Sequence, residues 1–215
     1  MQRALIWLVS VVVLAWTVSA HAALPSLKGT YAFTGTLGCL FAPGSDSAPP
    51  NPPGTMLPNA GFRANLVPFD VPSSFSISNS IVGVRRFNGD GTGTVSATEV
   101  GIVMRPTPGP TGYPSFPPDA SSAQIQYSFT YTFNPNGTFA TSLSGPLSGT
   151  FLAGPRSGQT FSIPDLPQFL GVPSQDFSTI VLAEPAPMVE TVTYSNGDVW
   201  PRICHRSRVL IRIGQ

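Results

Sequence analysis

The sequence predicts an all-β fold, a single up-and-down antiparallel β-barrel of about eight or nine strands joined by hairpins and long Pro-rich loops. Short segments alternate apolar and polar residues with the period of a strand. Turn-forming residues separate these segments, and glycine (21 residues) and proline (24 residues) are abundant. Closure into a barrel removes the unpaired edges that such a meander would expose. A β-sandwich is the alternative, which strand count alone does not exclude.

Residues 1–22 have the pattern of a cleavable secretory signal peptide. Arg3 gives a short positive start, residues 4–18 form an almost unbroken apolar run, and Ala20-x-Ala22 is the small-x-small motif that signal peptidase accepts. The predicted cleavage is before Ala23. A retained membrane anchor is disfavoured because the apolar run is shorter than the roughly 18 residues of a spanning helix. We therefore expect a secreted or periplasmic protein with no stable membrane span after cleavage.

Residues 23–215 are expected to form one β-barrel domain, since this length suits a single all-β core. Arg3 is the only charged residue of the predicted leader, so its removal lowers the formal charge from +1 to 0. Lys28 is the only lysine. Because a nucleic-acid partner requires a basic cluster, none is expected.

The first expected strand spans residues 29–41, with Tyr31, Phe33 and Leu37 on one face and threonines on the other. Residues 42–73 follow and contain eight prolines. Proline fixes φ and removes a ladder donor, so this segment is expected to be a long irregular loop.

A hairpin is expected next, with strands at residues 75–87 and 93–104 around the turn 88–91. Residues 88–99 also have the oxygen spacing of a Ca²⁺-binding loop, but their strand-like flanks favour the hairpin. A second Pro-rich loop is expected at residues 105–118.

The clearest alternation follows this second loop. One face of the expected strand is aromatic and the other carries glutamine, serine and threonine, so one side is buried and the other wet. The aromatic face consists of Tyr127, Phe129, Tyr131 and Phe133. These rings either line a ligand cavity or fill the barrel as its core. The remaining expected strands lie at residues 138–152, 161–163, 177–182, 189–194 and 199–213.

The two cysteines, Cys39 and Cys204, belong to the first and last expected strands. In an oxidising compartment two cysteines most simply form one disulfide. The predicted bridge would staple these two strands together and close the barrel. Two free buried thiols are the alternative.

The start of the first strand resembles that of a known family. The segment Leu27-Lys28-Gly29-Thr30-Tyr31 resembles the Gly-x-Trp start of lipocalin-like (calycin) barrels, with Tyr31 in place of tryptophan. In those barrels an arginine of the last strand crosses the aromatic residue, and Arg206, Arg208 or Arg212 would do so here. The resemblance implies a container for a small molecule, whereas the long Pro-rich loops depart from the family pattern.

The last expected strand is rich in arginine. Four arginines share one alternation with Cys204, while Ile203, Val209 and other aliphatic residues take the opposite face. The four are Arg202, Arg206, Arg208 and Arg212. They face either solvent, as an outer wall, or the interior, where they would meet an anion. Cys204 favours the interior, and a bulge near Pro201 would instead keep the charges outside.

No catalytic, cofactor or metal site is expected. His205 is the only histidine after the leader, and neither a Gly-x-Ser-x-Gly nor a His-Glu-x-x-His motif occurs. The leading interpretation is an exported, non-enzymatic β-barrel that binds a small apolar ligand. The alternative is an extracytoplasmic surface or matrix protein whose long loops contact proteins or glycans. An enzyme ranks third, and a barrel embedded in lipid is disfavoured because the outward positions are polar.

Overall fold

Eleven strands form one antiparallel sheet in the computed structural model, which describes residues 26–42, 61–69, 71, 74–104 and 119–214. The strands are β1 (Lys28–Phe41), β2 (Phe75–Asn88), β3 (Thr92–Met104), β4 (Ala120–Phe133), β5 (Phe139–Leu143), β6 (Leu147–Ala153), β7 (Thr160–Ile163), β8 (Phe169–Pro173), β9 (Thr179–Ala183), β10 (Val189–Tyr194) and β11 (Val199–Gly214). The predicted all-β class is confirmed. The predicted leader, the loop at 105–118 and most of the loop at 42–73 lie outside the described residues. No helix among the described residues is long and apolar enough to cross a membrane.

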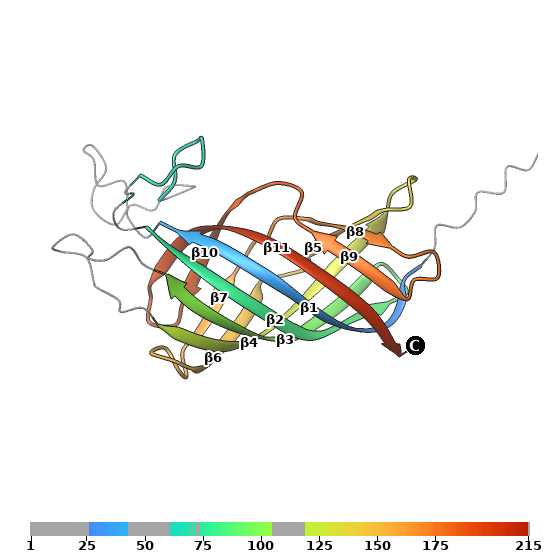
Figure 1. The fold of residues 1–215 in the computed structure, drawn as a ribbon, viewed down its shortest axis with the longest axis horizontal. Coiled ribbons are helices and arrows are strands. Elements are labelled where there is room, and N and C mark those ends of the chain that lie inside the picture. The colour runs from blue at the N-terminus through green and yellow to red at the C-terminus, as the bar shows by residue number, and fades with distance from the viewer. Residues whose placement is uncertain (1–25, 43–60, 70, 72–73, 105–118, 215) are drawn as a thin grey trace, which may run out of the picture.

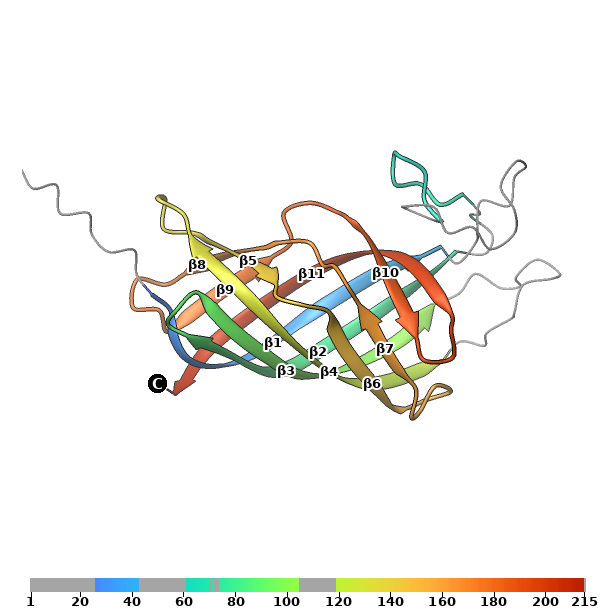
Figure 2. The same ribbon diagram turned by 180° about the vertical axis from the view of Figure 1, so that it is seen from behind.

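The sheet closes on itself through the pairing of β1 with β11. One ring of eight strands runs β1-β2-β3-β4-β5-β8-β9-β11. At the other end of the molecule, β6, β7 and β10 take the places of β5, β8 and β9 between β4 and β11 (Figures 1 and 2). The up-and-down barrel is thus confirmed, although three of its eight positions are each filled by two short strands.

The three split positions have a common cause in the sequence. β5 and β6 both pair with β4, so they are two halves of one strand broken at residues 144–146. The pairs β7 and β8, and β9 and β10, are broken at residues 164–168 and 184–188. Each break contains proline, which cannot donate to the ladder. The prediction of a single strand at residues 138–152 is therefore wrong, and no strand is predicted from the sequence at the position of β8.

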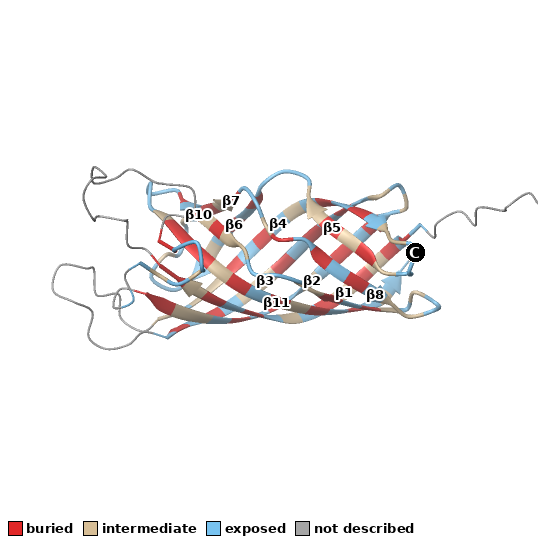
Figure 3. Ribbon diagram, turned by 90° about the horizontal axis from the view of Figure 1, so that it is seen from above, coloured by how far each residue is buried: buried red, intermediate tan, exposed pale blue. Residues whose placement is uncertain are grey.

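Buried and exposed residues alternate along the long strands, as the banding in Figure 3 shows. Toward one end, the Phe87 ring makes edge contacts with Tyr31, Phe129 and Tyr131, with centroids 5.4, 5.3 and 5.3 Å away. The Tyr131 hydroxyl donates to the Leu27 carbonyl at 2.6 Å. This end of the barrel is a packed aromatic core.

The other end has a second aromatic cluster. The Phe41 and Phe75 rings stack at 5.1 Å, and Trp200 meets both edge-on. In the β1–β11 register, Tyr31 lies opposite Arg212 and Phe41 lies opposite Arg202. The positions between these pairs therefore lie between the two aromatic clusters.

The segment with Ca²⁺-loop spacing is a hairpin turn. The Asp90 carboxylate accepts hydrogen bonds from the Thr92 amide at 2.9 Å and the Thr92 hydroxyl at 2.6 Å. Glu99, the last residue of that spacing, lies well along β3. Within the described part of the chain, no group of three His, Cys, Asp or Glu residues could hold a metal ion.

Candidate functional site

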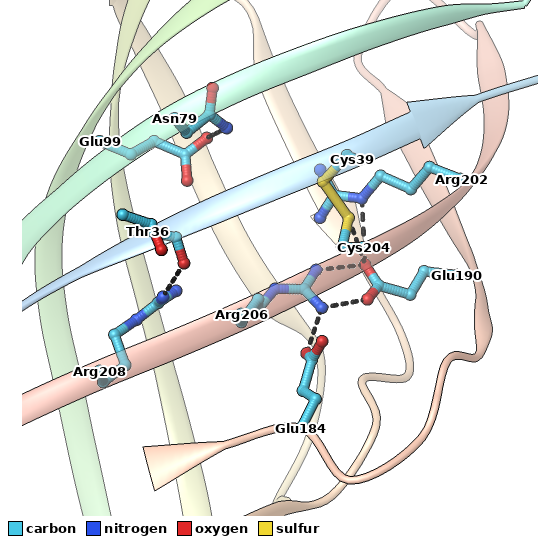
Figure 4. Close-up of a disulfide and its surroundings, with 10 residues drawn as sticks. All are labelled: Thr36, Cys39, Asn79, Glu99, Glu184, Glu190, Arg202, Cys204, Arg206 and Arg208. Carbon is cyan, nitrogen blue, oxygen red and sulfur yellow. Dashed lines mark hydrogen bonds and ion pairs between the residues drawn. A yellow bond between two sulfur atoms is a disulfide. The ribbon is translucent and has the colours of Figure 1, made fainter. Parts of the chain in front are cut away.

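Cys39 and Cys204 form the predicted disulfide. The S–S distance is 2.08 Å and the Cα–Cα distance 4.1 Å, and the two residues are register partners in β1 and β11 (Figure 4). The bridge joins strands 165 residues apart in sequence and lies inside the barrel, where both cysteines are buried. Beside it lies a cluster of ionised side chains.

Three of the four last-strand arginines face the interior. Arg202, Arg206 and Arg208 are buried, so the outer-wall alternative is wrong for them. The register of β10 with β11 continues past Pro201 without a shift, and the strand therefore keeps these residues in phase with Cys204. The fourth, Arg212, is only partly buried and donates to the Lys28 carbonyl at 2.9 Å.

A missing side chain makes room for one of these arginines. Gly35 of β1 pairs with Arg208, and a Cβ at Gly35 would lie 2.6 Å from the Arg208 Cδ. Arg212 is the register partner of Tyr31, the tyrosine at the calycin-like start. The resemblance to that family stays a prediction.

Glu190 of β10 is the centre of the buried ion network. Its carboxylate accepts a hydrogen bond from Arg202 Nε at 3.0 Å and two from Arg206, one of them from Nη2 at 2.6 Å (Figure 4). Arg206 also pairs with Glu184. Burial alone would raise the pKa of Glu190, but the two guanidinium groups hold this pKa below its ordinary value. Both partners of this bidentate pair are therefore charged in the interior.

Polar side chains also extend from β2 and β3. Asn79 Nδ2 donates to Glu99 Oε1 at 3.4 Å, while the buried Asn79 Oδ1 has no hydrogen-bond partner among the residues that the structure describes (Figure 4). Desolvation raises the pKa of Glu99, and Arg202 and Arg206 only partly offset it. Burial therefore favours the neutral form of the Glu99 carboxyl group.

Arg85 and Arg208 are buried without an ion pair among the described residues. Arg208 Nη1 donates to the Thr36 and Ser207 carbonyls at 2.7 and 2.8 Å, and burial lowers the pKa of Arg208 to about 10. Arg85 Nη2 donates to Thr141 Oγ1 at 3.2 Å. The Arg85 guanidinium also lies 3.9 Å from the centroid of the Phe129 ring.

Some of these groups line a cavity of about 70 Å³ inside the barrel. One part of its wall is apolar, with Ile77, Ile125 and Phe161, and another carries ionisable groups. The ionisable and polar residues of the wall include Glu99, Tyr127, Arg202, Arg206 and Arg208. Sites for drug-sized ligands measure about 300–1,000 Å³. The cavity therefore suits only a small molecule or a few waters.

The aromatic face of β4 divides between this cavity and the core. Tyr127 lines the cavity, whereas Phe129 and Tyr131 are buried in the aromatic core. Phe133 is partly buried and packs edge-on against Tyr131 at 6.3 Å.

A second hollow lies on the outer wall over β4, β6, β7 and β10 and measures about 570 Å³. Its side chains are almost all uncharged and polar. They include Gln124, Gln126, Ser148, Thr150, Thr160, Ser162 and Thr193. Register pairing aligns them in rows across the strands, because Ser148 lies opposite both Gln126 and Ser162.

Comparisons with protein-family models, curated proteins and solved structures found no match to this chain. The site therefore rests on its own geometry. Its carboxylates and Arg85 were not expected to meet inside the barrel. For three of these residues the sequence contains a signal for burial. Arg85, Glu99 and Glu190 lie in phase with the buried residues of their strands. Glu184 lies in a strand break and had no such signal.

Proposed function

We propose that this chain is an exported, non-enzymatic β-barrel that holds a small ligand in its interior. The observation that carries the proposal is the convergence of ionisable side chains on one internal cavity. Buried ions oppose folding unless they are paired, and a barrel that served only as a scaffold would be more easily filled with apolar residues. Perturbed ionisable groups around a cavity are typical of binding sites. The disulfide is compatible with an oxidising compartment and supports export.

The proposed ligand is small and amphipathic. The volume of about 70 Å³ limits its size. The mixed wall favours a short apolar chain with a polar or anionic head over the wholly apolar ligand suggested by the aromatic strand. His205 is exposed on the outer face of β11 and is no general base for this cavity, which supports the non-enzymatic proposal.

Butanol, butyrate and butylammonium test the proposal, because they share one chain and differ in the charge of the head group. Guanidinium groups in the wall favour neutral and anionic heads, so butanol and butyrate should raise Tm saturably and butylammonium should not. The Val192→Phe substitution fills the cavity and should abolish the rise. Val181→Phe, on the outer wall, is the matched control and should keep it. If none of the three solutes raised the Tm of the wild-type protein, the container would be excluded.

A surface or matrix protein is the second candidate, and the polar hollow on the outer wall favours it. Rows of amide and hydroxyl groups match the hydroxyl groups of a neutral glycan. Binding of the exported protein to an array of neutral oligosaccharides would test this role. The double variant Gln124→Ala/Gln126→Ala should lose binding, and Thr132→Ala, exposed on the same strand, should not. An array without any bound glycan would count against the second candidate.

A further inference from the structure

A small void of about 10 Å³ lies beside the main cavity, against β2 and β11. Arg85, Tyr127 and Arg208 line it, and the other lining residues are apolar. Tyr127 and Arg208 also line the main cavity, so the two spaces are neighbours. A volume of about 10–15 Å³ holds one water-sized particle.

Both arginines at this void have unused hydrogen-bonding capacity. Arg85 is 3% exposed, and its buried Nε has no hydrogen-bond partner among the described residues. Arg208 is 8% exposed, and among the described residues its hydrogen bonds run from Nη1 to two backbone carbonyls. Neither forms an ion pair with a carboxylate of the described residues, whereas Arg202 and Arg206 are both paired with Glu190. The void is therefore lined by the two buried arginines that form no ion pair within the described part of the chain.

The chemistry of the lining favours an anion over water. A guanidinium group only donates hydrogen bonds, and the phenol oxygen of Tyr127 is the only side-chain acceptor in the lining. A water molecule must donate two hydrogen bonds, while an anion only accepts. Arginine does not escape burial by losing its proton, so its charge requires a counter-charge. Burial lowers the pKa of both Arg85 and Arg208, and at Arg208 the nearby Glu99 and Glu184 offset this effect only in part.

We propose that a small monovalent anion of halide size binds in this void between Arg85 and Arg208, beside Tyr127. The anion offsets one of the two positive charges at the void and accepts hydrogen bonds from both guanidinium groups, as Glu190 does for the neighbouring arginines. This site goes beyond the proposed function, since it requires no ligand in the main cavity.

Thermal unfolding in sodium chloride, bromide and sulfate at matched ionic strength tests the site. Chloride and bromide should raise Tm saturably, because they bind the folded state. Sulfate is divalent and too large for the void, so it should give no saturable rise in Tm, only the gradual rise that its exclusion from the protein surface causes. Arg85→Met should lose the halide response. Arg86→Met, whose side chain is exposed on the outer face of β2, should retain it. Equal Tm values in the three salts would overturn the proposal.

Crystals of the wild-type protein grown with bromide give a readout that does not depend on the folding of a variant. The expected result is an anomalous peak between the two guanidinium groups, and bromide only elsewhere would refute the site. Butyrate distinguishes this anion from the cavity ligand. If the two sites are separate, chloride should not reduce the rise in Tm that butyrate causes. A failure of the container proposal would then leave the halide site standing, and a failure of the halide site would leave the container proposal standing.

Discussion

At the scale of single residues, the interior combines packed aromatic rings with buried ions. Phe129 contacts both kinds of group. It packs edge-on against Phe87, and its ring centroid lies 3.9 Å from the Arg85 guanidinium. Glu99 and Glu190 illustrate two outcomes of burial. Two arginines keep the pKa of Glu190 low, whereas desolvation prevails at Glu99 and raises its pKa.

The Phe129→Ala substitution should reduce the free energy of unfolding by about 3–5 kcal/mol, the range for a fully packed ring. Phe129 is 1% exposed, so its removal leaves a void and exposes the Arg85 guanidinium. Denaturant unfolding measures the change. The matched control is Thr130→Ala, whose side chain is exposed, and its effect should stay below about 1 kcal/mol. A loss below about 1 kcal/mol for Phe129→Ala would show that the ring is not part of a packed core.

The pH dependence of stability should reveal the raised pKa of Glu99. The folded protein holds the Glu99 proton to higher pH than the unfolded chain, whose ordinary value is 4.5. The contribution of this group to stability is therefore present below about pH 4.5 and is lost as the pH rises through the folded pKa. Glu99→Gln keeps the side chain neutral. Its free energy of unfolding relative to wild type should thus increase from pH 4.5 to 8.

Glu190→Gln provides the contrast in the same denaturant titration. The lowered pKa of Glu190 gives stability that is present above about pH 4.5 and is lost in acid. The free energy of unfolding of this variant should therefore fall furthest below that of the wild type at neutral pH. A difference between Glu99→Gln and wild type that does not change with pH would contradict the raised pKa of Glu99.

At the scale of elements, three glycines are covered by aromatic rings of the adjacent strands. Gly93, Gly149 and Gly171 are the register partners of Phe129, Phe161 and Phe139. A Cβ at each glycine would lie 2.3 Å from the Cζ atom of its partner. These pairs allow the rings to lie flat against the neighbouring strand, and they favour one register over its alternatives.

Gly149→Ala should destabilise the protein by about 1–3 kcal/mol, the usual cost of overpacking a core. The added methyl group would meet three atoms of the Phe161 ring within 2.9 Å. Gly38→Ala is the matched control, because a Cβ there has no neighbour within 4 Å. The control should be neutral or stabilising by about 0.4–1 kcal/mol, since alanine restricts the unfolded chain. Equal effects of the two substitutions in denaturant unfolding would exclude the ring contact as the cause.

At the scale of the whole molecule, the barrel depends on the contact between its first and last strands. β1 and β11 pair over almost their full length, and the disulfide fixes that pairing near one end. The chain between the cysteines includes all of the strands from β2 to β10. A cross-link across so long a segment restricts the unfolded state strongly.

The double variant Cys39→Ser/Cys204→Ser should lose about 2–5 kcal/mol of stability, because the unfolded chain is no longer closed into a loop. Denaturant unfolding of the oxidised wild type, the reduced wild type and the variant would measure it. The reduced protein should match the variant, since both lack the cross-link. If reduction left the midpoint of denaturant unfolding unchanged, the disulfide would not contribute to the stability of the folded barrel.

The sequence by itself determined the local features of this protein. Alternation in residues 124–133 determined a strand with one aromatic face, and the turn at residues 88–91 determined a hairpin. Cys39 and Cys204 indicated that the first and last strands meet. These features could be predicted because each depends on residues close in sequence, or on a covalent bond that only two residues can form.

Only the tertiary structure decided which charges lie inside. The alternation of residues 199–213 defined two faces of the last strand but did not determine which one faces inward. Arg206 is buried because Glu184 and Glu190 reach it from the β9–β10 segment, and Arg208 because Gly35 leaves space across β1. The energy of a buried charge depends on such partners, which are distant in sequence and meet only when the barrel closes.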